Sequence, residues 1–76
     1  MNNKCYSVLF DCSNGIQWET SIYAKSITHA MKQAIYEFSQ ERKAGTLTVS
    51  LADFRTRKDE LEVLTKQLDD QGNVLS

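Results

Sequence analysis

The sequence predicts an α+β fold: one amphipathic helix packed on one face of an antiparallel sheet of three to five strands, in the order β-β-α-β-β. Two observations support this prediction. Residues 26–43 place apolar side chains three and four positions apart, which is the spacing of one face of an α-helix. The flanking segments alternate between apolar and polar residues, as strands with one buried face do. With 76 residues, the chain is expected to be a single domain, residues 1–76.

The helix is expected over residues 26–43, SITHAMKQAIYEFSQERK. Its apolar stripe consists of Ile27, Ala30, Met31, Ala34, Ile35 and Phe38. Ser26 is placed as the N-cap, because its hydroxyl can accept a hydrogen bond from an N–H of the first turn. Arg42 and Lys43 would lie in the last turn, where cations suit the negative end of the helix dipole. Gly45 would then stop the helix in a left-handed conformation.

Residues 4–12 and 16–24 are expected to form a hairpin that precedes the helix. The turn between them is assigned to Asn14 and Gly15, because both residue types tolerate a positive φ. Leu9 and Tyr23 are expected on the solvent-exposed face of the hairpin. The side chains expected to face the helix are Tyr6, Val8, Phe10, Ile16, Trp18, Thr20, Ile22 and Ala24.

The third strand is expected over residues 46–54, with Leu47, Val49 and Leu51 in the core, followed by an exposed turn at residues 55–60. Residues 61–68, LEVLTKQL, fit two structures. As a helix, they form a leucine stripe; as a strand, Val63 and Thr65 align with Leu61. We favour the strand, because a three-stranded sheet would end on a long uncovered edge. Residues 69–76 then supply a turn and a short last strand.

The charge is unevenly distributed along the chain. Residues 1–58 carry eight Lys or Arg and five Asp or Glu, a balance of +3, whereas residues 59–76 carry one Lys and five Asp or Glu, a balance of −4. No apolar run is long enough for a membrane helix, and the first residues lack the features of a signal peptide. A cytoplasmic protein without a membrane partner is therefore expected.

Catalytic, cofactor and metal sites are not expected. Cys5 and Cys12 would lie about 23 Å apart on opposite faces of one strand, whereas a disulfide needs Cα atoms within about 7 Å. Zinc usually takes four ligands, and His29 is the only histidine. No spacing supplies His29 with an acid–base partner. The chain is therefore expected to be a binding protein, not an enzyme, and to need no cofactor.

Three kinds of surface remain as candidate sites. The first binds a protein partner through exposed tyrosines and through the acidic C-terminal residues, which would imitate nucleic-acid phosphates and engage a basic groove. Its candidate residues are Asp59, Glu60, Glu62, Asp69, Asp70, Tyr23 and Tyr36. The alternative is a nucleic-acid-binding regulator that uses the basic turn of Arg55, Arg57 and Lys58. The third is a structural protein that forms a homodimer through an exposed strand edge.

Residues 22–34, IYAKSITHAMKQA, lead from the hairpin into the helix. This arrangement, followed by further antiparallel strands, resembles small phage and prophage proteins, among them several anti-CRISPR proteins of the type I systems. The resemblance covers the general plan of the chain and assigns no functional residue. It implies a non-catalytic inhibitor that occludes a host protein or nucleoprotein complex. We therefore predict a small protein-binding module, with nucleic-acid binding as the alternative.

Overall fold

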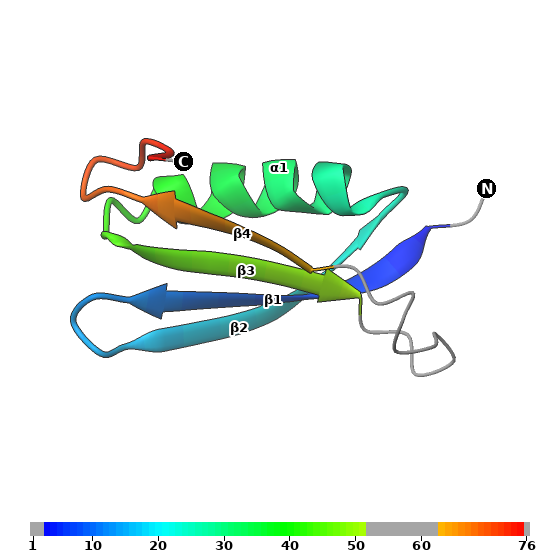
Figure 1. Cartoon of the computed structure of the whole chain (residues 1–76), viewed down its shortest axis with the longest axis horizontal. Helices are drawn as coiled ribbons and strands as arrows, with labels where there is room; N and C mark the ends of the chain where they lie inside the picture. Colours follow the sequence, from blue (N-terminus) through cyan, green and yellow to red (C-terminus); the bar gives the residue numbers. More distant parts are fainter. Residues whose placement is uncertain (1–2, 52–62, 76) are drawn as a thin grey trace.

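The computed structural model describes residues 3–51 and 63–75. Its elements are β1 (Lys4–Cys12), β2 (Gln17–Ala24), α1 (Ile27–Ser39), β3 (Gly45–Leu51) and β4 (Val63–Leu68). The strands form one antiparallel sheet in the order β2-β1-β3-β4, and α1 covers one face of it (Figure 1). The predicted α+β class, with one helix and an antiparallel sheet, is confirmed. The helix follows β2.

The predicted fifth strand at the C-terminal end is wrong. The sheet has four strands, and the residues after β4 form only a single bridge, between Leu68 and Val74. A tight turn at residues 69–73 brings the chain back beside β4, where Leu75 N–H donates to the Gln67 carbonyl at 2.8 Å and the pairing extends no further among the described residues. No helix among the described residues is long and apolar enough to cross a membrane.

The core lies between α1 and the sheet, as the helical periodicity predicts. Ala30, Met31, Ala34 and Phe38 are buried, and Ile27 and Ile35 are half-buried against them. The strands contribute Tyr6, Val8, Phe10, Cys12, Ile22, Ala24, Leu47, Val49, Leu51 and Leu68. The rings of Phe10 and Phe38 pack with their centroids 5.0 Å apart. The helix is therefore held by its apolar stripe, which is the main source of helix stability in proteins.

The N-terminal end of α1 is capped as predicted, but its C-terminal end differs from the prediction. Ser26 Oγ accepts a hydrogen bond from the backbone N–H of His29 at 3.3 Å. The helix ends at Ser39, so Arg42 and Lys43 lie beyond its last turn. Arg42, not Gly45, takes the left-handed conformation, with φ 53°.

Gly45 instead begins β3, and its lack of a side chain has a packing reason. A Cβ at this position would lie 2.7 Å from the Asp11 carbonyl oxygen and 2.8 Å from a ring carbon of Phe10. Contacts this short are repulsive, so the close approach of β3 to β1 requires glycine here. The prediction of a helix stop at Gly45 is therefore wrong, because tertiary packing rather than backbone handedness selects the residue.

The hairpin between β1 and β2 has a three-residue loop. Cys12 N–H donates to the Ile16 carbonyl at 2.9 Å, and Gly15 N–H donates to the Cys12 carbonyl at 3.0 Å. Gly15 has φ 94°, whereas Asn14 is not left-handed; its side-chain oxygen accepts from Ile16 N–H at 3.1 Å. This is a type I turn with a glycine bulge. The predicted turn is in place, but only Gly15 uses a positive φ.

Strand β4 confirms the strand assignment for the ambiguous segment and shows which face it buries. Its pairing with β3 places Leu64 opposite Val49 and Lys66 opposite Leu47, on the side of the helix. Val63 is exposed on the opposite face, as is Thr65. Leu61 lies outside the described residues, as do residues 52–60.

Candidate functional site

Asp69 and Asp70 are the two acidic candidates that the structure places, and both lie in the turn after β4. One carboxylate oxygen of Asp69, Oδ1, accepts hydrogen bonds from Asn73 N–H at 2.8 Å and from Gln71 N–H at 2.9 Å. These bonds, that to Asn73 first, lower the pKa of Asp69 below its ordinary value, because they favour the charged form. Asp69 therefore stabilises the turn. Asp70 is exposed.

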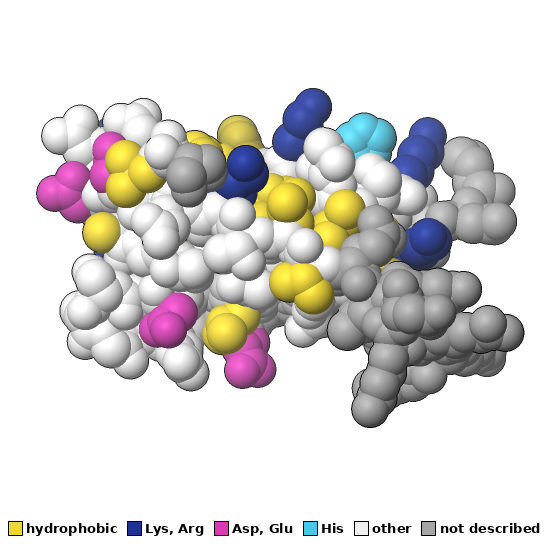
Figure 2. Space-filling view, in the orientation of Figure 1, with side chains coloured by type: hydrophobic (Ala, Val, Ile, Leu, Met, Phe, Trp, Pro, Cys, Tyr) yellow, Lys and Arg dark blue, Asp and Glu magenta, His cyan; other side chains and the backbone are white. Residues whose placement is uncertain are grey.

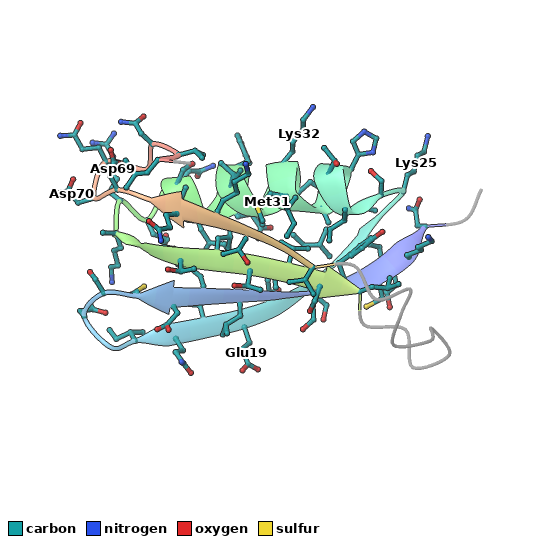
Figure 3. All side chains as sticks on the ribbon, viewed as in Figure 1. Glu19, Lys25, Met31, Lys32, Asp69 and Asp70 are labelled. Atoms are coloured by element: carbon teal, nitrogen blue, oxygen red, sulfur yellow. The ribbon has the colours of Figure 1, made fainter. Side chains whose placement is uncertain are left out.

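This turn is also packed against the end of the helix. Gly72 has φ 86°, and a Cβ there would collide with the carbonyl oxygen of Ser39. The Asp69 and Asp70 side chains lie at this end of the molecule, away from Lys25 at the start of the helix (Figure 3). The acidic turn is thus a defined structural unit at one end of the sheet.

The other charged candidates lie outside the described residues. They are Asp59, Glu60 and Glu62 of the acidic set and Arg55, Arg57 and Lys58 of the basic set. Their roles stay predictions.

The open face of the sheet, which faces away from α1, offers little to a nucleic acid. The strand register places Asp11 and Glu19 on this face, together with rows of serine and threonine. No Lys or Arg of the described strands shares it, and Tyr23 is its only aromatic residue there. Lysine side chains are seen instead along the helix side (Figure 2). Phosphate binding and base stacking, which need cations and exposed aromatics, are not supported by this face.

Tyr36 lies on the outer face of α1, as predicted, and 72% of it is exposed. It borders a shallow hollow of about 470 Å³ that is also lined by Lys32, Gln33 and Glu37. One positive and one negative side chain flank the ring, so the hollow has no strong charge preference. This surface can contact a protein, but a single aromatic residue does not define a partner.

Strand β2 and Ile16, the residue before it, expose a second group of large apolar side chains. Tyr23 is 68% exposed on the open face, Ile16 is 48% exposed, and Trp18 is 38% exposed. Ile16 and Trp18 were predicted to face the helix. Trp18 lies on that side, opposite Phe10, but both residues stay exposed. Trp18 touches Phe38 edge-on, with ring centroids 6.5 Å apart, and Lys43 Nζ lies 5.8 Å from its ring centre. Its remaining surface faces outward because β2 is the edge of the sheet.

The backbone of β2 also presents free hydrogen-bonding groups. Cys12 bonds to Ile16 across the hairpin, and bonded pairs alternate along an antiparallel ladder. The residues of even number in β2 therefore point their N–H and C=O groups toward β1. The residues of odd number point theirs away from the sheet: Gln17, Glu19, Ser21 and Tyr23. We call these backbone groups, with the side chains of Ile16, Trp18 and Tyr23, the β2 edge.

The opposite edge of the sheet, on β4, is partly covered. The same alternation leaves Val63, Thr65 and Gln67 pointing outward from β4. The Gln67 carbonyl already accepts a hydrogen bond from Leu75 N–H at 2.8 Å, beside the Leu68–Val74 bridge. No described residue covers the β2 edge in this way.

Comparison with known proteins does not add a family to this description. No family model matches this chain, and no curated protein or solved structure matches it either. Of the residues that the sequence indicated, Tyr23 belongs to the β2 edge, whereas Ile16 and Trp18 were missed. The near absence of charge in residues 16–24, where Glu19 is the only charged residue, is the signal that could have identified them.

The structure also places His29 and the two cysteines. His29 is exposed and borders a hollow of about 270 Å³ with Lys25, Gln33 and Tyr23, where β2 meets the start of α1. Cys12 is buried and Cys5 is half-buried, and both are free thiols. No cluster of three potential metal ligands occurs in the part of the chain that the structure describes.

Proposed function

We propose that this chain is a non-enzymatic protein-binding module that takes up an extended strand along the β2 edge. The observation that supports this function is the β2 edge itself. It combines four residues with outward-pointing backbone groups and three exposed apolar side chains. In strand addition, the backbone bonds provide affinity and the alternate side chains provide selectivity.

The β2 edge lacks the features that usually prevent strand addition. Edge strands of soluble proteins are commonly protected by lysines, prolines, bulges or a covering segment. β2 is eight residues long and contains no lysine and no proline, and Glu19 is its single charged residue. Each backbone bond gained contributes about 0.5–1.5 kcal/mol net. Burial of apolar surface on Trp18 and Tyr23 adds about 25 cal/mol per Å².

The test compares two substitutions at one position of the β2 edge. Ser21→Pro removes an outward N–H that the sheet itself does not use, and proline is tolerated on edge strands. Ser21→Ala keeps the N–H and serves as the matched control. In affinity capture from a host lysate, we expect the wild type and Ser21→Ala to retain a partner protein that Ser21→Pro loses.

Circular dichroism must first show that Ser21→Pro is folded. Nuclease treatment of the lysate separates protein partners from nucleic acid, which the alternative function would retain. Equal capture of the same proteins by all three forms would contradict binding through the β2 edge.

The finer proposal, an inhibitor that occludes a host complex in the manner of anti-CRISPR proteins, rests on the acidic residues. Its support among the described residues is Asp70, which is exposed next to Asp69, whose carboxylate accepts a hydrogen bond from Asn73 N–H. Reversing the charge of Glu60, Glu62 and Asp70 should weaken binding to a basic partner. Unchanged binding would contradict imitation of phosphates and leave strand addition in place.

A further inference from the structure

We propose that the β2 edge pairs with the β2 edge of a second copy of this chain, antiparallel, about a two-fold axis that passes through Thr20. This inference rests on the proposed function, since it names the strand that the β2 edge takes up in the purified protein, before another partner displaces it. The result is one continuous sheet of two subunits. The position of the single charge and the difference between the two sheet edges support it.

The spacing of the outward residues suits self-pairing. Gln17, Glu19, Ser21 and Tyr23 are placed symmetrically about Thr20. An antiparallel partner related by an axis at Thr20 sets Gln17 against Tyr23 of the second copy, and Glu19 against Ser21. All four outward residues of both copies are then paired. Bonded pairs must join residues whose backbone groups both point outward. Directly opposed residues carry their side chains on the same face of a sheet, so the two helices fall on the same face of the combined sheet.

The charge of Glu19 favours this register over its neighbours. An axis at Glu19 would place two carboxylates directly opposite each other, which is destabilising in a sheet. An axis at Ser21 would leave Gln17 opposite Lys25, which lies outside β2. Only the axis at Thr20 sets Glu19 against an uncharged side chain and uses the full strand.

The same register covers the exposed apolar side chains. Trp18 lies opposite Ile22 of the second copy, and Ile16 lies opposite Ala24, all on the helix side. Tyr23 lies opposite Gln17 on the open face. The helices do not obstruct this pairing, because α1 runs along the strands and packs over all four of them, not over β2 alone (Figure 1). Helices centred on two four-stranded sheets would be about 19 Å apart at a strand spacing near 4.8 Å, which exceeds a helix diameter of about 10–12 Å.

The difference between the two sheet edges favours pairing through β2. Leu75 N–H already occupies the Gln67 carbonyl there, whereas the β2 edge has no cover among the described residues. Pairing through identical β2 edges uses the same surface on both copies and therefore closes. Stable interfaces bury about 1,200–2,000 Å², and a single strand pair lies at the low end, so we expect a dimer in the micromolar range.

The test uses cysteine cross-linking in the full chain, in a Cys5→Ser background that leaves only the buried Cys12. Thr20 pairs with itself at a non-bonded position, where Cα atoms are about 4.5 Å apart, within the range of a disulfide. Thr20→Cys should therefore form a covalent dimer under mild oxidation. Ser21→Cys is the matched control. In this register, position 21 of one copy is a diagonal neighbour of position 21 of the other, about 7–8 Å away. These cysteines should therefore cross-link at least about tenfold more slowly.

A charge-swap pair tests the same axis without oxidation. Thr20→Lys and Thr20→Glu each place like charges face to face, so each protein alone should be monomeric by sedimentation at concentrations where the wild type is dimeric. An equimolar mixture should restore the dimer. Thr20 is exposed, so neither substitution disturbs the core, and circular dichroism confirms the fold.

Two outcomes would overturn this inference. Faster cross-linking of Ser21→Cys than of Thr20→Cys would contradict the register. A wild-type mass that stays monomeric up to about 1 mM, where even a weak complex of about −4 kcal/mol forms, would contradict the dimer. In that second case, capture of another protein that Ser21→Pro abolishes would still support the proposed function, so the two failures are distinguishable.

Discussion

At the scale of single residues, the acidic turn shows how one carboxylate can stabilise a turn by accepting hydrogen bonds from its backbone. Asp69 Oδ1 bonds two backbone N–H groups within the next four residues, and Asp69 N–H itself donates to the Asn73 carbonyl at 2.9 Å. Asp70, its neighbour, is exposed. The sequence marks both as an acidic pair in a turn, but only the fold distinguishes the structural carboxylate from the free one.

Asp69 should make the stability of the protein pH-dependent. Its pKa is lower in the folded state than in the unfolded state, so the stabilisation is present above the unfolded value and is lost as pH falls through the folded value. At pH 7, Asp69→Asn should unfold at a lower temperature than the wild type, and Asp69→Ala at a still lower one, because Asn keeps an acceptor. The difference between the wild type and Asp69→Asn should shrink below about pH 4.

Thermal unfolding followed by circular dichroism measures this effect. Asp70→Asn is the control, since Asp70 is exposed and its change should leave the midpoint nearly constant. A difference between the wild type and Asp69→Asn that stays constant as the pH is lowered from 7 into the acid range would contradict the assignment, because this stabilisation is lost as the folded-state carboxyl takes up its proton.

At the scale of elements, the helix follows from local spacing, whereas its end depends on contacts from distant residues. The six apolar positions and the Ser26 cap can be identified from residues within one or two turns, and the structure confirms them. The C-terminal end is set by Arg42 in a left-handed conformation and by the fit of Gly45 against Asp11. Those contacts join β3 to β1 across more than 30 residues, so local pattern does not reveal them.

The two faces of α1 should differ sharply in their sensitivity to mutation. Phe38 is buried against Phe10 and Trp18, so Phe38→Ala should lower the free energy of unfolding by about 3–5 kcal/mol. Tyr36 is exposed on the opposite face, and Tyr36→Ala should change it by less than about 0.5 kcal/mol. Urea denaturation measures both. Similar losses from the two substitutions would contradict the packing described for α1.

At the scale of the whole molecule, the strand order decides which residues are available for binding. Because β3 pairs with β1 on the side opposite β2, the hairpin strand β2 becomes an edge. The alternation of Ile16, Trp18 and Ile22 predicts one buried face for this strand, but it does not indicate whether a neighbour lies on both sides. The exposure of Ile16 and Trp18 results from pairing between distant segments, so the alternation alone does not reveal it.

Amide hydrogen exchange should report this strand order directly. In dilute protein, the N–H groups of Glu19, Ser21 and Tyr23 should exchange faster than those of Thr20 and Ile22, which bond to β1. Raising the concentration should slow the first set selectively as the β2 edge becomes paired. Equal protection of both sets in dilute protein would show that the edge is already covered, which contradicts its availability.

Trp18, which Lys43 contacts, gives the protein an intrinsic fluorescent reporter at the β2 edge. The chain has a single tryptophan, this residue is 38% exposed, and Lys43 Nζ lies 5.8 Å from the ring centre. The tryptophan fluorescence therefore reports on the β2 edge alone. Occupation of that edge, by any strand, should shift the emission to shorter wavelength and reduce quenching by iodide. Binding at the Tyr36 side of the helix should leave the spectrum unchanged, so unlabelled protein can distinguish the two surfaces.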